Sequence, residues 1–264
     1  MEEINVPRVV DLASRTGKIL LESGSDIVRV EETINHIMHS YGIYEYDIFT
    51  VASGIFISAS DVKAKVGDSR RSRTRICNVP RSSTNLGKVD AVNTLSRRIE
   101  AEHLSLDTAE EELCKIEKMP KELPLFRIAS AAVGAGALSL IFGGTYMDLL
   151  AALLVTALYY PLSIILDRTG LSKLLTNLIS GICIALFSVG CVKIGLGDGL
   201  DMVIIGAIMP LIPGVMFVNA IRDIAAGDYI TGSVRLIDAV VIAFGIALGV
   251  GITLMFFRSV GLAI

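Results

Sequence analysis

The segment from Pro210 to Asp223 carries two prolines, an amide and a charge pair within or just after an apolar stretch long enough to cross a bilayer. Proline has no backbone N–H and breaks or kinks a helix. Unpaired backbone groups and polar side chains are costly at membrane depth, so they usually face a cavity or a partner helix. Freed carbonyls and broken helix ends can hold small polar or ionic solutes. The sequence therefore predicts a solute-binding break in this segment.

The residues of this segment, with one amide elsewhere, form the predicted substrate-binding set. Gly214 allows close approach of a ligand or a backbone, the Asn219 amide can bond an amino, hydroxyl or carboxyl group, and Arg222 can pair with a carboxylate in bidentate fashion. Asp223 and Asp228 are the proton-coupling candidates, or they balance nearby arginines. The plainer alternative is that the prolines only shape packing, the charges are solvated in a cytoplasmic loop, and the remote amide bonds a neighbouring helix. The full set is Pro210, Pro213, Gly214, Asn219, Arg222, Asp223 and Asn177.

Two unlike compositions are joined near residue 122. Up to Glu122 the chain has 20 acidic and 17 basic residues, whereas from Leu123 onward it has no Glu, seven Asp and seven Lys or Arg. Pro120 and Pro124 mark the junction. This predicts a soluble domain over 1–122 and a membrane domain over 123–264.

Five apolar segments in the second half approach the length of about 20 residues that a spanning helix needs. Positively charged flanks place the N-terminal domain in the cytoplasm, and five spans then place the C-terminus outside. Met1–Leu21 has early acidic residues and no apolar core, so no cleavable signal peptide is expected. Tyr146, Tyr159 and Tyr160 are the aromatic residues expected at the interface, since the chain has no Trp. The predicted spans are 125–142, 147–166, 174–192, 202–221 and 236–257.

Small residues on the last span, Gly245 and Gly249, offer a contact face for a partner helix. In the N-terminal half, periodicity predicts an α+β domain. Helices are expected over 7–21, from a cap within Ser23–Asp26 to a stop at Gly42, over 89–99, and from Thr108 onward. Strands are expected over 44–50, 54–60, 62–66 and 73–76. The predicted fold class is an α-helical membrane protein, a five-span transmembrane bundle with an N-terminal α+β cytoplasmic domain.

Enzyme chemistry is poorly represented in the chain. His36 and His39 lie three residues apart on one helix, but no His-Glu-x-x-His pattern accompanies them, and Ser23 and Ser25 have no recognisable triad partners. A basic cluster lacks stacking aromatics, which disfavours nucleic acid and leaves anionic lipid, an acidic subunit or plain solvent as its partner. We expect no metal, no cofactor and no enzymatic activity. The alternatives are a membrane-tethered hydrolase using the N-terminal domain, or a regulatory or scaffold membrane subunit. The cluster comprises Arg70, Arg71, Arg73, Arg75 and Arg81.

The motifs of both halves resemble the threonine/serine exporter family. The N-terminal likeness lies in residues 21–26 and 29–33, in Gly54–Ser58, and in Thr74-Arg75 before Val79. The membrane likeness lies in residues 212–214 and 219–223, followed by Gly227-Asp228 and Gly232.

The resemblance implies export of a small polar metabolite across a bacterial cell inner membrane. Long members of the family join such a unit to a second, shorter membrane module. This chain resembles the split form, in which a separate small membrane subunit completes the transporter. Split pairs are associated with succinate export and long forms with threonine and serine, so the substrate stays open between these amino acids and a dicarboxylate. No ATP-binding motif is visible, which favours secondary transport. The expected partners are the lipid bilayer, the small subunit and further copies of the chain.

Overall fold

A computed structural model describes residues 5–60, 72–79, 84–120 and 123–261. The chain forms two compact units. Unit 1 comprises Met1–Pro120 and Val215–Leu236, and unit 2 comprises Lys121–Gly214 and Ile237–Ile264. The domain limits expected from composition, 1–122 and 123–264, remain a prediction. The units differ from them because a short helical segment late in the chain packs with the N-terminal residues.

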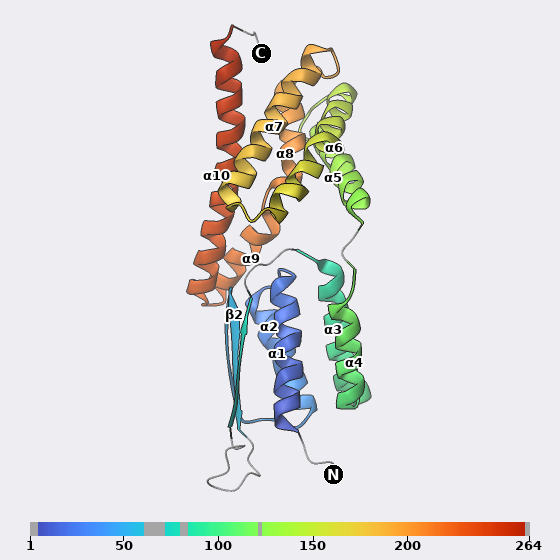
Figure 1. The fold of residues 1–264 in the computed structure, drawn as a ribbon, viewed down its shortest axis with the longest axis vertical. Helices are drawn as coiled ribbons and strands as arrows, with labels where there is room; N and C mark the ends of the chain where they lie inside the picture. The colour runs from blue at the N-terminus through green and yellow to red at the C-terminus, as the bar shows by residue number, and fades with distance from the viewer. Residues whose placement is uncertain (1–4, 61–71, 80–83, 121–122, 262–264) are drawn as a thin grey trace. The chain divides into compact units, whose positions relative to one another are not determined.

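Two helices, α1 (Val6–Glu22) and α2 (Ile27–Ser40), lie side by side in unit 1 (Figure 1). Their facing sides bury apolar residues such as Leu20 and Ile34 in one core. Asp26 caps α2 by accepting a hydrogen bond from the backbone N–H of Arg29 at 2.9 Å. Gly42, with a φ of 75°, follows the helix end in a conformation that suits glycine. Both predicted helices are confirmed.

A small antiparallel sheet covers these helices, in the order β1 (Tyr46–Val51), β2 (Gly54–Ser60) and β3 (Ser72–Asn78). Alternation along the strands places Ile55 and Ile57 in the core. On the opposite face Phe49 pairs with Phe56 across β1 and β2. Three of the predicted strands correspond to these elements, and the fourth, 62–66, lies outside the described residues.

Two further helices, α3 (Leu86–Glu102) and α4 (Leu106–Glu117), complete the N-terminal part of unit 1. The predicted start of α4 at Thr108 is wrong. Ser105 caps the helix instead, with its Oγ accepting from the backbone N–H of Thr108 at 3.3 Å. Serine is the better cap here because it lies directly before the first helical residue.

The helices of unit 2 are long and apolar: α5 (Pro124–Ile141), α6 (Tyr146–Arg168), α7 (Lys173–Lys193) and most of α10 (Tyr229–Ser259). These four are long and apolar enough to cross a membrane. A fifth span is counted if the broken pair Leu200–Leu211 and Gly214–Ala225 is taken as one. The chain is thus a multi-pass helical membrane protein.

Glycines bring α7 and α10 into close contact within unit 2. A Cβ added at Gly245 would lie 2.9 Å from the carbonyl oxygen of Leu174, and one added at Gly249 would meet the carbonyl oxygen of Leu178. The predicted small-residue face therefore exists, but it packs against α7 of the same chain rather than waiting for a partner helix.

Candidate functional site

The chain breaks where the two prolines predict it. Helix α8 (Leu200–Ile208) ends in a single 3-10 turn, η1 (Met209–Leu211), which contains Pro210. Ile212 is extended, with φ of −64° and ψ of 125°, because Pro213 disfavours a helical conformation in the residue before it. Helix α9 (Gly214–Ala225) then begins, and the chain bends by 57° across the break. The predicted fourth span is therefore two helices rather than one kinked helix.

A buried tyrosine supports the end of α8. The Tyr159 hydroxyl donates to the carbonyl oxygen of Ala207 at 2.7 Å, and Tyr159 is 1% exposed. The break deprives carbonyls of their helical donors, and in an apolar setting a side chain has to satisfy them. The expectation that Tyr159 belongs to an interfacial belt is wrong, since its ring lies in the core of unit 2.

The surroundings of Gly214 and Asn177 are plain. A Cβ added at Gly214 would meet no atom of the described residues within 4 Å, so no part of the described chain uses the space. The Asn177 amide donates to the carbonyl oxygen of Lys173, one turn earlier on α7, at 2.8 Å. The roles assigned to Pro210, Pro213, Gly214 and Asn177 stay predictions.

Within unit 1, the polar residues that follow the break meet the turn between α1 and α2. Asp223 on α9 is fully buried. Its Oδ2 accepts from Nη1 of Arg235 at 2.7 Å, and its Oδ1 accepts from the backbone N–H of Ile27 at 3.3 Å. A fully buried carboxylate requires such partners, because desolvation disfavours its charge.

A second ion pair joins the same elements. Nη1 of Arg222 lies 2.9 Å from Oδ2 of Asp26, whose other oxygen caps α2. Asp26 is 5% exposed, whereas half of the Arg222 side chain (54%) remains exposed. Arg222 therefore keeps donors available to solvent while it holds the buried carboxylate.

Backbone carbonyls of the turn accept the remaining donors. The Asn219 amide donates to the carbonyl oxygen of Gly24 at 2.8 Å, and Nη2 of Arg235 donates to that of Ser25 at 2.8 Å. We call this set the turn cluster, since it joins the turn to α9 and the start of α10: Gly24, Ser25, Asp26, Asn219, Arg222, Asp223 and Arg235.

The turn cluster unites the two sequence motifs, which lie about 200 positions apart. It contains two carboxylates and two guanidinium groups, so its charges balance. The hydroxyl oxygens of Ser25 and Thr231 are buried with no hydrogen-bond partner among the described residues. Sequence reasoning placed Asn219, Arg222 and Asp223 together but did not identify the turn as their partner.

The glycines and Asp228 of the second motif shape the connection from α9 to α10. Gly227 has a φ of 93°, which favours glycine, and Oδ1 of Asp228 accepts from the backbone N–H of Thr231 at 3.1 Å. A Cβ at Gly232 would lie 2.9 Å from the carbonyl oxygen of Ala220. Asp228 therefore acts locally as a helix cap, and a role in proton coupling stays a prediction.

The side chains considered for other chemistry have ordinary partners. His36 pairs with Glu100 at 3.1 Å, and His39 contacts the Tyr46 hydroxyl at 2.9 Å. Arg75 pairs with Asp11 at 3.0 Å. Arg70, Arg71 and Arg81 lie outside the described residues. Across the residues that the structure describes, no three His, Cys, Asp or Glu side chains are grouped to hold a metal ion.

Comparison with known proteins gives the family. A family model described as "Putative threonine/serine exporter" matches residues 11–257. The "Threonine/serine exporter" of Corynebacterium glutamicum is 25% identical over 254 residues, covering 94% of this chain and 51% of that protein. The "Probable threonine/serine exporter" of Mycobacterium tuberculosis is 24% identical over 267 residues, covering 100% of this chain and 49% of that protein. The chain thus spans about half the length of the curated relatives it matches. No solved structure matches it significantly. With this match across most of its length, the chain belongs to the threonine/serine exporter family.

Proposed function

We propose that the protein exports a small polar metabolite from the cytoplasm across a bacterial inner membrane by secondary active transport. The substrate class is threonine and serine, or a dicarboxylate such as succinate. The family is one of exporters rather than of enzymes, and the helices of unit 2 suit a lipid environment. The observation that carries the proposal is the helix break at Pro210–Pro213, followed directly by α9 with its amide and charges.

The break supplies what a substrate site in a membrane needs. Broken helix ends present polar backbone groups where lipid offers none, and transporters of many folds hold solutes at such ends. The space beside Gly214, which no described atom fills within 4 Å of an added Cβ, leaves room for a solute. Pro210, Pro213, Gly214 and Asn177 form this part of the proposed site.

The turn cluster suggests how the remaining proposed site residues act. The Asn219 amide and Nη1 of Arg222 are already bonded to the turn. A solute carboxylate would compete with Asp26 for Arg222, using the donors that remain exposed. In this proposal the closed turn cluster is one state of the transport cycle, and release of the turn frees Asn219 and Arg222 for the solute.

Proton coupling is assigned to Asp223 and Asp228. Protonation of Asp223 would remove the charge that holds Arg235 and so weaken the turn cluster. This links proton binding to release of the turn in one step. We propose accordingly that the N-terminal part faces the cytoplasm, and that α8 with α9 forms a fifth, broken span, which places the C-terminus outside.

A second membrane module is also part of the proposal. The curated relatives are about twice as long as the region they share with this chain. We propose that a further short membrane segment, on a companion subunit or elsewhere, takes part in transport, alone or together with further copies of the chain. Co-purification of the tagged protein from its native cells tests for the companion.

One observation favours a different role for α9. Because Asn219 and Arg222 bind the turn, their function would be structural if the protein were a regulatory or scaffold subunit. That alternative predicts that Asn219→Ala and Arg222→Ala leave export intact, whereas deletion of unit 1 does not.

The experiment is an efflux assay in cells that lack the gene and carry it on a plasmid. Loaded threonine, serine and succinate are followed in the medium. The proposal predicts that the wild-type gene restores export of at least one solute and that Arg222→Ala does not. Arg258→Ala is the control, because Arg258 lies in the last turn of α10, away from the proposed site in the sequence. Unchanged export of all three solutes on deletion refutes the proposal.

A further inference from the structure

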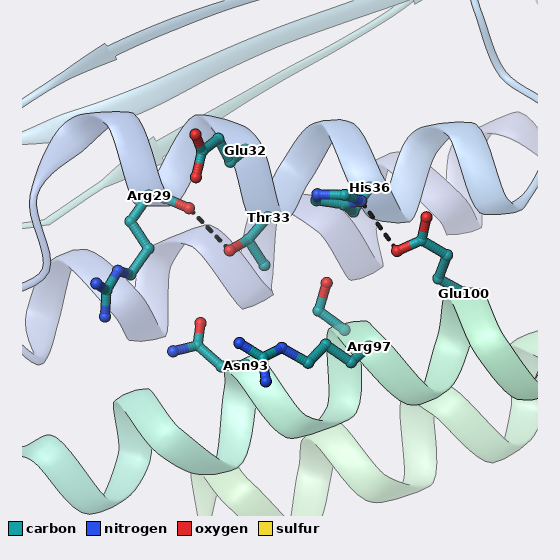
Figure 2. A pocket seen from close by; sticks show the side chains of 8 residues that line it. Arg29, Glu32, Thr33, His36, Asn93, Arg97 and Glu100 are labelled. Carbon is teal, nitrogen blue, oxygen red and sulfur yellow. Dashed lines mark hydrogen bonds and ion pairs between the residues drawn. The ribbon is translucent and has the colours of Figure 1, made fainter.

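A cavity of about 420 Å³ lies between α2 and α3, wholly within unit 1. Its walls are polar. Figure 2 shows Arg29 reaching in from α2 and Asn93 and Arg97 from α3, with the paired His36 and Glu100 at one end. Ser96, which is 7% exposed, also lines it. The volume suits a small metabolite of a few heavy atoms.

The positive groups of this cavity lack strong partners. In the part of the chain that the structure describes, Arg97 and Asn93 make no hydrogen bond or ion pair, and Arg29 has only a 4.0 Å contact with Asp26. Two guanidinium groups from opposite helices, with an amide between them, form a set of donors without acceptors. Forked guanidinium donors match a carboxylate.

The negative groups of the cavity differ in how they are used. Glu100 is paired with His36 at 3.1 Å, so its charge is already engaged. Glu32 lines the cavity and has no partner among the described residues. A ligand that brings an ammonium group would satisfy Glu32, whereas a second carboxylate would not. Solutes that differ in this group therefore reveal the role of Glu32.

We propose that the α2–α3 cavity binds a small metabolite through its carboxylate, held by Arg29, Arg97 and Asn93. The backbone N–H of Arg29 donates to Asp26, a member of the turn cluster. A ligand on Arg29 therefore lies one helical turn from the residue that holds Arg222. If the proposed function is correct, the cavity reports the cytoplasmic concentration of a carboxylate to the transport cycle. Binding itself does not depend on that function.

The test uses the full chain, purified in detergent, with a thiol placed in the cavity. The four native cysteines are replaced by Ser, and Ser96→Cys adds a thiol that differs from the native side chain by one atom. Its alkylation rate is followed with threonine, serine, succinate or inorganic phosphate present. The proposal predicts slower alkylation with at least one of the three carboxylates and no effect of phosphate. Thr94→Cys, on an exposed part of α3 outside this cavity, should show no protection by any of them.

Variants then assign the contacts. Arg97→Ala should weaken protection about tenfold or more, since a hydrogen bond to a charged group contributes about 1.5–3 kcal/mol and 1.4 kcal/mol is a factor of ten in affinity. Arg98→Ala is the matched control, because the neighbouring Arg98 pairs with Glu102 and Glu112 instead. Glu32→Gln should weaken threonine and serine but not succinate if Glu32 holds an ammonium group.

Two results overturn the proposal: no protection by any of the three carboxylates, or protection that Arg97→Ala leaves unchanged. Protection by phosphate as strong as by carboxylates also overturns it, since the cavity would then be a general anion site. None of these outcomes bears on export, which the efflux assay measures separately.

Discussion

The two ion pairs of the turn cluster should differ sharply in their contribution to stability. Arg235→Met removes the main partner of Asp223, which is fully buried and would keep only the 3.3 Å bond from Ile27. Breaking a buried pair in this way costs about 3–5 kcal/mol, because an uncompensated charge remains. Arg222→Met should cost about 1 kcal/mol, since the Arg222 side chain is 54% exposed and Asp26 keeps its bond to the Arg29 backbone.

A single buried thiol measures this difference. The chain has no Trp, so intrinsic tryptophan fluorescence cannot follow unfolding. Cys77 lies in the core of unit 1, and replacing the other three cysteines by Ser leaves it as the only thiol. Its alkylation across a denaturant series reports the opening free energy of unit 1.

Arg258→Met is the control, and it should shift the midpoint little. Adding Asp223→Asn to Arg235→Met should recover part of the loss, as expected for coupled partners. Equal losses for Arg235→Met and Arg222→Met would refute the reasoning.

Three further predictions concern stability. Burial raises the pKa of Glu31 above its usual value, so the protonated form is favoured in the fold; its stabilising effect is present below the unfolded pKa and is lost as pH rises through the folded pKa. Glu31→Gln should therefore stabilise unit 1 increasingly above about pH 4.3, as Cys77 alkylation at several pH values would show, and a constant difference would contradict it. Gly249→Ala should lower thermal stability by about 1–3 kcal/mol in circular dichroism because α7 lies against it, whereas Gly251→Ala, with no described atom within 4 Å, should not. Tyr159→Phe should cost about 1 kcal/mol and Tyr160→Phe little, and equal costs would show that the Tyr159 hydroxyl bond contributes nothing.

Local chemistry in the sequence predicts much of this fold. Apolar residues at helical spacing locate α2, and Gly42 locates its end, because both signals act within a few residues. Pro210 and Pro213 locate the helix break for the same reason, since each removes a backbone donor where it stands.

Long-range partners are not encoded in this way. Asn219 bonds the carbonyl oxygen of Gly24, 195 positions away, and a backbone acceptor has no sequence signal. The partner of Gly249 was missed likewise, because a small residue indicates close packing without identifying the helix that packs there. The start of α4 was missed for a local reason: Ser105 and Thr108 are both competent caps, and burial of Ala109 and Leu113 decides the helix phase.

Labelling of a thiol at the helix break tests the central proposal most directly. Gly214→Cys should be tolerated, since no described atom lies within 4 Å of the new Cβ. In cells that carry this variant on a background without native cysteines, a water-soluble thiol reagent is applied with and without threonine, serine or succinate. We predict that the thiol reacts and that the exported solute slows the reaction. A thiol that fails to react, or that reacts at the same rate with every solute, would contradict a solute pathway at Pro210–Gly214.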